Sequence, residues 1–223
     1  MKINDRLKLV GDYVDKGSIP LDIGCDHAKL SIYLLKEKNF PFVYASDNKI
    51  GPLNQAKENV NYYNLADKIE LIKADGLNSL NDKIDTITVT GMGGLTINKM
   101  FLENRDKLTN IKTIILSPNN FIKEVRETIT SLGYYLKDEE LVEESNKLYH
   151  ILVFSKGNKT YSDKELYLGP ILMTKNNEII KKFYKSELTN INNLLLNNKI
   201  SIDKKEKFIR IKEYLKSLNE NNY

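Results

Sequence analysis

Three aspartates stand at or just after short, β-type apolar segments within the first 75 residues: Asp22, Asp47 and Asp75. Open α/β folds bind ligands at the carboxyl ends of their parallel strands, so three such residues would form a row along one sheet edge. An acidic residue after the second strand is placed to accept hydrogen bonds from two ribose hydroxyls. Asp75 could accept one from an exocyclic amino group, as adenine has. The row therefore indicates a site for an adenosine-containing ligand.

The loop after the first segment narrows the choice of ligand. It reads Asp22-Ile-Gly-Cys-Asp-His-Ala28, whereas a dinucleotide-binding loop carries three glycines that let the backbone approach a pyrophosphate. Here only Gly24 is present, and Asp26 occupies the position of the second glycine. A carboxylate at Asp26 would repel a pyrophosphate but attract a cation, and S-adenosylmethionine carries both an ammonium and a sulfonium. His27 is either a cofactor contact or an ordinary loop residue.

Two further loops suit a planar, nitrogen-rich ligand. Gly91-Met-Gly-Gly94 follows the fourth predicted strand, and its glycines permit unusual dihedral angles and the close approach of a flat group. Met92 could supply a soft apolar contact. Ser117-Pro-Asn119 follows the fifth strand, and Asn119 would face the same crevice with both a donor and an acceptor.

These loops predict an S-adenosylmethionine site, and the sequence shows no pattern typical of a metal site or a Ser/His/Asp triad. The candidate cofactor-binding residues are Asp22, Gly24, Asp26, His27, Asp47, Asn48, Asp75, Gly76, Gly91, Met92 and Gly93. The candidate catalytic residues are Asp26 and Asn119.

The segments that must position these loops alternate between strand and helix patterns. Such alternation indicates βαβ units and a parallel sheet covered on both faces. The third, fourth and fifth strands are apolar and β-branched, as expected for strands buried on both faces. Only the polar stretch 143–147 separates the last two strands, which should pair as an antiparallel hairpin at one edge. The predicted strands are 18–22, 42–46, 69–72, 86–89, 113–116, 134–141 and 149–154.

The last part of the chain reads as helical. Ser162-Asp-Lys-Glu165 is a capping box that opens a helix, which Gly169-Pro170 interrupts. Two longer segments follow, each with one apolar stripe, and a turn near Lys199–Ser201 joins them. This pattern predicts an antiparallel, coiled-coil-like helical hairpin. The stripes are Ile180, Tyr184, Leu188, Ile191 and Leu195 on the first helix, and Phe208, Ile211, Leu215 and Leu218 on the second.

We therefore divide the chain into a sheet domain, residues 1–158, and a helical domain, residues 159–223. The sequence has 34 lysines and arginines against 30 aspartates and glutamates, a formal net charge of +4. Residues 1–160 hold 22 of each sign, so the whole excess lies in residues 161–223. A basic tail beside a neutral body favours a polyanionic partner, although a lysine-rich solvated helix face explains it equally well.

The composition also indicates in which part of the cell the protein works. No window approaches the ~18 consecutive apolar residues of a membrane span, and charges interrupt the N-terminal segment where a signal peptide would be apolar. The single cysteine, Cys25, cannot form an internal disulfide. We expect a cytoplasmic protein, without membrane association and monomeric.

Four of the segments together resemble the bacterial tRNA (adenine-22-N1)-methyltransferase family. They are Asp22-Ile-Gly-Cys-Asp-His-Ala28, Ala74-Asp-Gly76, Gly91-Met-Gly-Gly94 and Ser117-Pro-Asn119, and the resemblance extends over essentially the whole chain. It implies an α/β, Rossmann-like methyltransferase sheet, S-adenosylmethionine as methyl donor, and a C-terminal helical domain that helps hold the tRNA. The implied reaction methylates N1 of adenine 22 in the D-arm of tRNA. The basic surface departs from this picture, because only four of its residues are arginine.

Such a reaction needs no base, because adenine N1 has a free lone pair at neutral pH. In-line positioning and exclusion of water can supply roughly 7–11 kcal/mol of catalysis. The product base is cationic, so Asp26 or Asn119 could stabilise the developing charge.

Three other functions stay open at this point. An NAD-type oxidoreductase would need the three-glycine loop that the chain lacks. A non-enzymatic RNA-binding module would not need the full row of aspartates. A methyltransferase acting on another RNA or on a small molecule fits the periodicity equally well.

Overall fold

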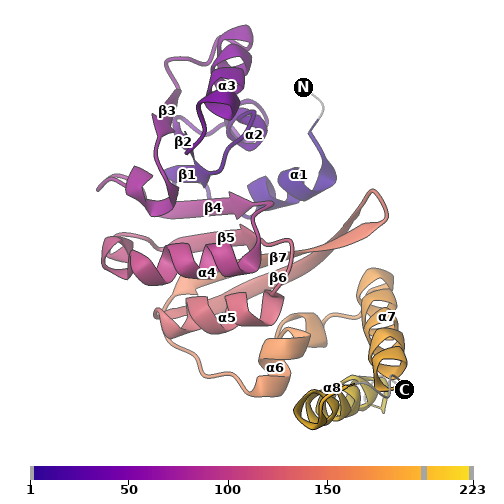
Figure 1. Ribbon diagram of the computed structural model, residues 1–223. Helices are drawn as coiled ribbons and strands as arrows, with labels where there is room; N and C mark the ends of the chain where they lie inside the picture. The colour runs from indigo at the N-terminus through magenta and orange to yellow at the C-terminus, as the bar shows by residue number, and fades with distance from the viewer. Residues whose placement is uncertain (1–2, 197–199, 221–223) are drawn as a thin grey trace. The chain divides into compact units, whose positions relative to one another are not determined.

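The computed structural model describes residues 3–196 and 200–220 and forms two compact units, Met1–Lys159 and Thr160–Tyr223. The first unit is built on a seven-stranded sheet of order β3-β2-β1-β4-β5-β7-β6 (Figure 1). Strands β1 to β5 are parallel, whereas β7 runs antiparallel to both β5 and β6. The strands are β1 Pro20–Ile23, β2 Val43–Asp47, β3 Ile69–Lys73, β4 Thr86–Thr90, β5 Thr113–Ser117, β6 Tyr134–Glu144 and β7 Lys147–Lys156.

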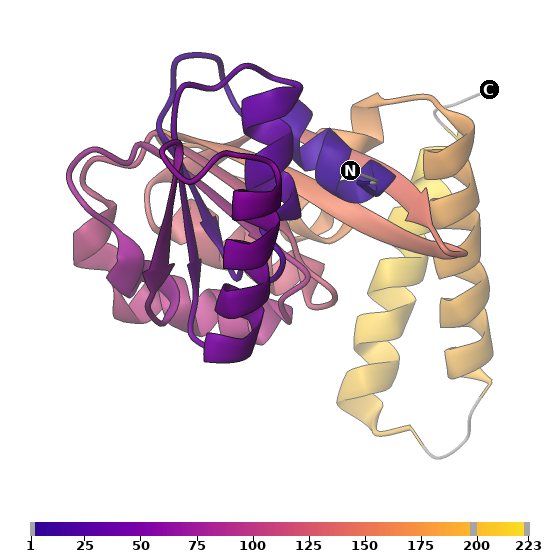
Figure 2. The same ribbon diagram turned by 90° about the horizontal axis from the view of Figure 1, so that it is seen from above.

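Helices cover both faces of the sheet, as βαβ connections require (Figure 2). Apolar residues from three helices and the facing strands form one continuous core cluster, which includes Val10, Ile32, Ala56 and Ile115. The helices on that face are α1 Asp5–Asp12, α2 Lys29–Lys36 and α3 Ile50–Tyr62, and those on the other are α4 Gly94–Glu103 and α5 Ile122–Ser131. Two short 3-10 turns, η1 Gly76–Ser79 and η2 Arg105–Leu108, complete the unit.

The edge hairpin is longer than the sequence predicts. Its strands meet at a two-residue turn, Ser145-Asn146, with φ of 50° and 61°. Two successive left-handed residues make the type of tight turn that matches the twist of a hairpin. The ladder therefore continues to the pair Glu144 and Lys147. The polar side chains of 143–147 suggested a loop, but backbone pairing does not require apolar side chains.

The second unit is helical, as predicted. Helix α6, Asp163–Leu168, begins with the capping box of Ser162 and Glu165, and η3, Leu172–Thr174, follows it. Helices α7, Glu178–Leu195, and α8, Ile202–Glu220, pack together through the predicted stripes. Of the predicted turn between them, Lys199 lies outside the described residues, whereas Ile200 and Ser201 directly precede α8. No helix in the described part of the chain is long and apolar enough to cross a membrane.

Asp22 connects the central strands β1 and β4 with helix α2 through hydrogen bonds. Its side chain is 2% exposed and accepts hydrogen bonds from Ser31 Oγ of α2 and Thr88 Oγ1 of β4, both at 3.2 Å. Burial raises the pKa of Asp22 from its ordinary value of 3.8 to about 6, although both hydroxyls oppose the shift. The carboxyl group is thus a shared anchor for β1, α2 and β4.

This burial predicts a pH-dependent stability that Asp22→Asn should remove. The unfolded chain ionises Asp22 near pH 4 and the folded chain near pH 6, so the folded state loses stability as the pH rises through this interval. The full loss above pH 6 is about 3 kcal/mol. Urea unfolding provides the measurement. Between pH 4 and pH 7, we expect the free energy of unfolding of the variant to rise relative to that of wild type. Parallel pH profiles for the two proteins would contradict this role.

Candidate active site

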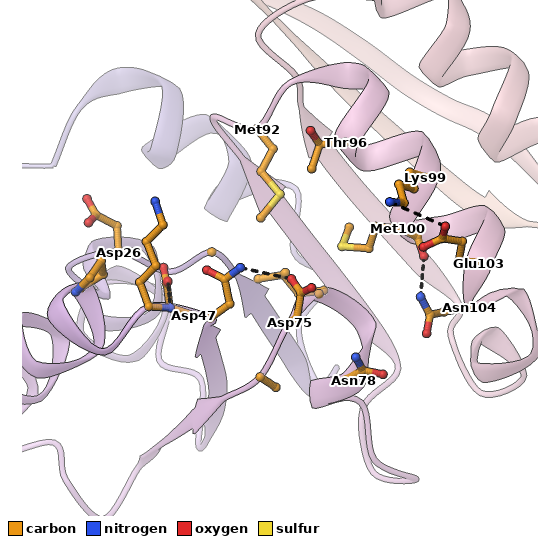
Figure 3. A pocket seen from close by; sticks show the side chains of 17 residues that line it. Asp26, Asp47, Asp75, Asn78, Met92, Thr96, Lys99, Met100, Glu103 and Asn104 are labelled. Atoms are coloured by element: carbon orange, nitrogen blue, oxygen red, sulfur yellow. Dashed lines mark hydrogen bonds and ion pairs between the residues drawn. The ribbon is translucent and has the colours of Figure 1, made fainter.

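A cavity of about 670 Å³ lies at the carboxyl edge of strands β1 to β4, the position at which open α/β sheets bind ligands. Figure 3 shows its two walls, with Asp26, Asp47 and Asp75 on one side and Met92, Thr96 and Met100 on the other. The strand-end wall consists of Ile23, Gly24, Asp26, Asp47, Asn48, Lys49, Pro52, Ala74, Asp75, Gly76 and Asn78. The facing wall consists of Met92, Thr96, Lys99, Met100, Glu103 and Asn104.

The loop after β1 is bent sharply under the cavity. Gly24 and Cys25 both donate their backbone N–H to Ser46 O of β2, at 2.8 and 2.9 Å. Gly24 has φ +71°, and a Cβ there would lie 2.7 Å from Met92 Cε. Asp26 follows with φ 49°, a conformation that is uncommon outside glycine. The sequence thus folds this loop so that a glycine faces the cavity and a carboxylate stands at its rim.

Asp26 is the outermost of the acidic residues. Its side chain is 67% exposed and lies 3.4 Å from His27 Nε2. His27 contributes to the rim through this contact with Asp26 and is not among the lining residues.

Asp47 and Asp75 occupy the inner part of the same wall. Asp47 Oδ1 accepts a hydrogen bond from the backbone N–H of Lys49 at 2.9 Å, which fixes the turn into α3. Asn48 donates from Nδ2 to Asp75 Oδ1 at 3.3 Å. Each carboxylate keeps acceptor capacity beyond these single bonds, so the pair can still receive donors from a ligand.

The loop after β4 is held in place from β5. Asn119 donates from Nδ2 to Gly91 O at 2.6 Å and from its backbone N–H to Met92 O at 2.9 Å. Asn120 Oδ1 accepts from the N–H of Gly94, the first residue of α4, at 2.9 Å. Asn119 therefore positions Met92 against the cavity without lining it.

Seven of the twelve predicted site residues line the cavity, and five do not. The lining ones are Gly24, Asp26, Asp47, Asn48, Asp75, Gly76 and Met92; the others are Asp22, His27, Gly91, Gly93 and Asn119. Asp22 is buried beneath the site and bonded to hydroxyls, so its part is to support the strand ends.

Sequence reasoning missed the face of α4. Thr96, Lys99, Met100 and Glu103 line the cavity from this helix, and Lys99 pairs with Glu103 at 3.9 Å. Their spacing of three and four residues places them on one helical face. The spacing identifies one face of the helix, but it does not indicate whether that face points toward the cavity.

The cavity favours a ligand with a positive centre. Its lining includes four carboxylates, Asp26, Asp47, Asp75 and Glu103, but only two ammonium groups, Lys49 and Lys99. Water-filled clefts focus such an excess of charge. Two acidic side chains at the ends of β2 and β3 also suit ribose hydroxyls and an amino group. In the described part of the chain, no group of three or more His, Cys, Asp or Glu side chains could hold a metal ion.

Comparison with known proteins agrees with this geometry. Residues 20–220 match the family model TrmK, described as tRNA (adenine(22)-N(1))-methyltransferase. The chain is 31% identical over 195 residues to the Bacillus subtilis tRNA (adenine(22)-N(1))-methyltransferase, which covers 84% of this chain and 82% of the relative.

Solved structures give the same result. A Streptococcus pneumoniae protein in complex with S-adenosyl-L-methionine is similar with a TM-score of 0.89 and 28% identity, over 97% of this chain and 99% of that one. Mycoplasma capricolum TrmK in complex with S-adenosyl-homocysteine gives 0.82 and 25%, over 99% and 98%. The expected α/β, Rossmann-like methyltransferase fold is confirmed, and the chain belongs to the TrmK family of tRNA (adenine(22)-N(1))-methyltransferases.

Proposed function

We propose that the protein transfers a methyl group from S-adenosylmethionine to N1 of adenine 22 in the D-arm of tRNA. The observation that carries the proposal is the convergence of Asp26, Asp47 and Asp75 on one acidic cavity in a chain of this family. Family membership argues against the dehydrogenase and the non-enzymatic RNA-binding alternatives. The relatives bound to S-adenosyl-L-methionine and to S-adenosyl-homocysteine support the choice of cofactor.

The residues of the cavity fit such a cofactor. A Cβ at Gly24 would lie 2.7 Å from Met92 Cε, and one at Gly76 would lie 2.6 Å from Met100 Sδ. At both positions a Cβ would collide with a methionine of the facing wall, so only glycine lets Met92 and Met100 pack this closely against the strand-end loops. When bound, S-adenosylmethionine supplies an electrophilic methyl group on a positively charged sulfur. The excess of carboxylates around the cavity would stabilise that positive charge.

Individual residues then take distinct binding roles. Asp47, at the end of β2, would accept hydrogen bonds from ribose hydroxyls, and Asp75 would accept from the adenine amino group. Asn48 keeps Asp75 oriented. Asp26, at the exposed rim, would face the cationic end of the cofactor.

Methylation of the target adenine depends on how the protein positions the base, and it requires no general acid or base. Its N1 lone pair can attack directly, so the protein must hold the ring in line and exclude water. Asn119 commits Nδ2 to Gly91 O, which leaves its Oδ1 as the atom able to accept from a bound base. We assign Asn119 as the residue that contacts the target adenine, with Asp26 supplying negative charge across the site.

The second unit would hold the tRNA. The whole net charge of +4 lies in residues 161–223, and exposed basic residues on α8 include Lys204, Lys205 and Lys207. Positive charge of this kind attracts phosphates through release of counterions, without need for bidentate geometry. We further propose that the protein acts as a monomer in the cytoplasm, where its tRNA substrate is found.

The direct test is incubation with labelled S-adenosylmethionine and a tRNA transcript that carries adenine at position 22. We expect label in 1-methyladenosine after nucleoside analysis. A transcript with guanine at position 22 is the matched control and should stay unlabelled. Label in another nucleoside, or equal labelling of both transcripts, would show that the substrate assignment is wrong.

Removal of a ribose-binding carboxylate should weaken cofactor binding. We expect Asp47→Ala to lower the affinity for S-adenosylhomocysteine at least tenfold, because buried hydrogen-bond donors on the ligand would lose their acceptor. Asp26→Ala should have a smaller effect, since that side chain is 67% exposed.

Isothermal titration calorimetry provides the measurement, and Asp82→Ala is the control. Asp82 is exposed in the turn before β4, at the opposite end of the strand from the cavity. Unchanged affinity in Asp47→Ala would refute the placement of the ribose.

Neutralising three lysines of α8 should weaken the binding of tRNA but leave the binding of the cofactor unchanged. We expect the triple change Lys204→Gln, Lys205→Gln, Lys207→Gln to weaken tRNA binding several-fold and to flatten its salt dependence. Affinity for S-adenosylhomocysteine should not change. Equal tRNA affinity for the triple variant and wild type at physiological salt would count against a substrate-holding surface on this helix.

A further inference from the structure

Arg6 is an arginine held in an unusual setting within the first unit. Its guanidinium lies 4.2 Å from the centre of the Tyr149 ring, an arrangement that stabilises a cation over an aromatic face. Its Nε is 3.5 Å from Glu144 Oε2, and the side chain is only 16% exposed. The edge hairpin β6–β7 thus fixes the arginine from one side.

The guanidinium reaches the loop that follows β4. A Cβ at Gly91 would lie 3.8 Å from Arg6 Nη2, and Gly91 O accepts the side-chain bond from Asn119. Figure 1 shows α1 beside the turn end of the β6–β7 hairpin, at the end of the sheet toward which β4 and β5 point. Arg6 therefore stands by the loops that follow β4 and β5.

Arg6 also has polar atoms that the fold does not satisfy. Nε and Nη1 are buried, and neither has a hydrogen-bond partner among residues 3–196 and 200–220. The contact with Glu144 is an ion pair that lacks hydrogen-bond geometry. A ligand cannot reach these two buried nitrogens, so Nη2 is the guanidinium nitrogen left to bind one.

We propose that Arg6 binds a phosphate of the tRNA backbone beside the target adenosine. The inference rests on the proposed function, because it takes tRNA as the substrate. A base that enters the crevice near Asn119 must leave its own phosphates at the mouth, and a guanidinium is the side chain best suited to phosphate. Glu144 repels an anion on the Nε side, so the phosphate approaches Nη2 from the side of Gly91.

The test is the salt dependence of tRNA binding by Arg6→Met. Methionine keeps an aliphatic stem against Tyr149 but removes the charge. We expect tRNA affinity to fall about tenfold, and the slope of log K against log salt to shrink by about 0.7–0.9, the value for one phosphate contact. Affinity for S-adenosylhomocysteine should stay as in wild type, because Arg6 does not line the cofactor cavity.

Two further variants make the result decisive. Lys83→Met removes one exposed charge from the turn before β4, at the opposite end of the strands, and should leave the slope unchanged. Arg6→Gln repeats the test with a neutral polar side chain if the methionine variant does not fold.

The outcomes separate this inference from the proposed function. If wild type methylates tRNA and either Arg6 variant binds it with unchanged affinity and slope, the phosphate contact is refuted alone. A loss of affinity without a change in slope would equally refute it, since it would indicate a structural effect. If wild type does not methylate tRNA, the proposed function fails first.

Discussion

The structure depends on keeping several carboxylates close together at one edge of a sheet. Parallel pairing places the ends of β1, β2 and β3 side by side, with Ile23 opposite Ser46 and Asp47 opposite Lys73. Asp26, Asp47 and Asp75, which lie at or just after these strand ends, then line the same cavity. Their mutual repulsion is unfavourable without a ligand and becomes favourable once a cation lies between them. The order of the strands is therefore what makes the acidic site possible.

Much of this arrangement could be predicted from residue patterns. Apolar β-branched segments between helical ones identify the five parallel strands to within two residues at either end. Strand ends in such folds face ligands, so the order of residues along the chain suffices to assign Asp47, Asp75 and Gly24 to one site. The strict spacing of apolar residues also predicts α7 and α8.

The remaining features depend on directions that one-dimensional patterns do not contain. Asp22 lies one residue before the end of β1, so strand alternation places its side chain on the opposite face from the cavity-lining Ile23, toward Ser31 of α2. The lining face of α4 depends on how that helix packs. Arg6 is distant in sequence from Tyr149 and Gly91, and only the tertiary fold brings them together.

The contact between Gly94 and Asn120 has a mechanical consequence. A Cβ at Gly94 would lie 2.3 Å from Asn120 O, so the first turn of α4 and the segment before α5 are pressed together without an intervening side chain. Closely packed groups cannot slide independently. Any displacement of α4 when the donor pocket fills would therefore be transmitted to Asn119. The wall of the donor pocket on α4 and the position of Asn119 therefore belong to one tightly packed contact.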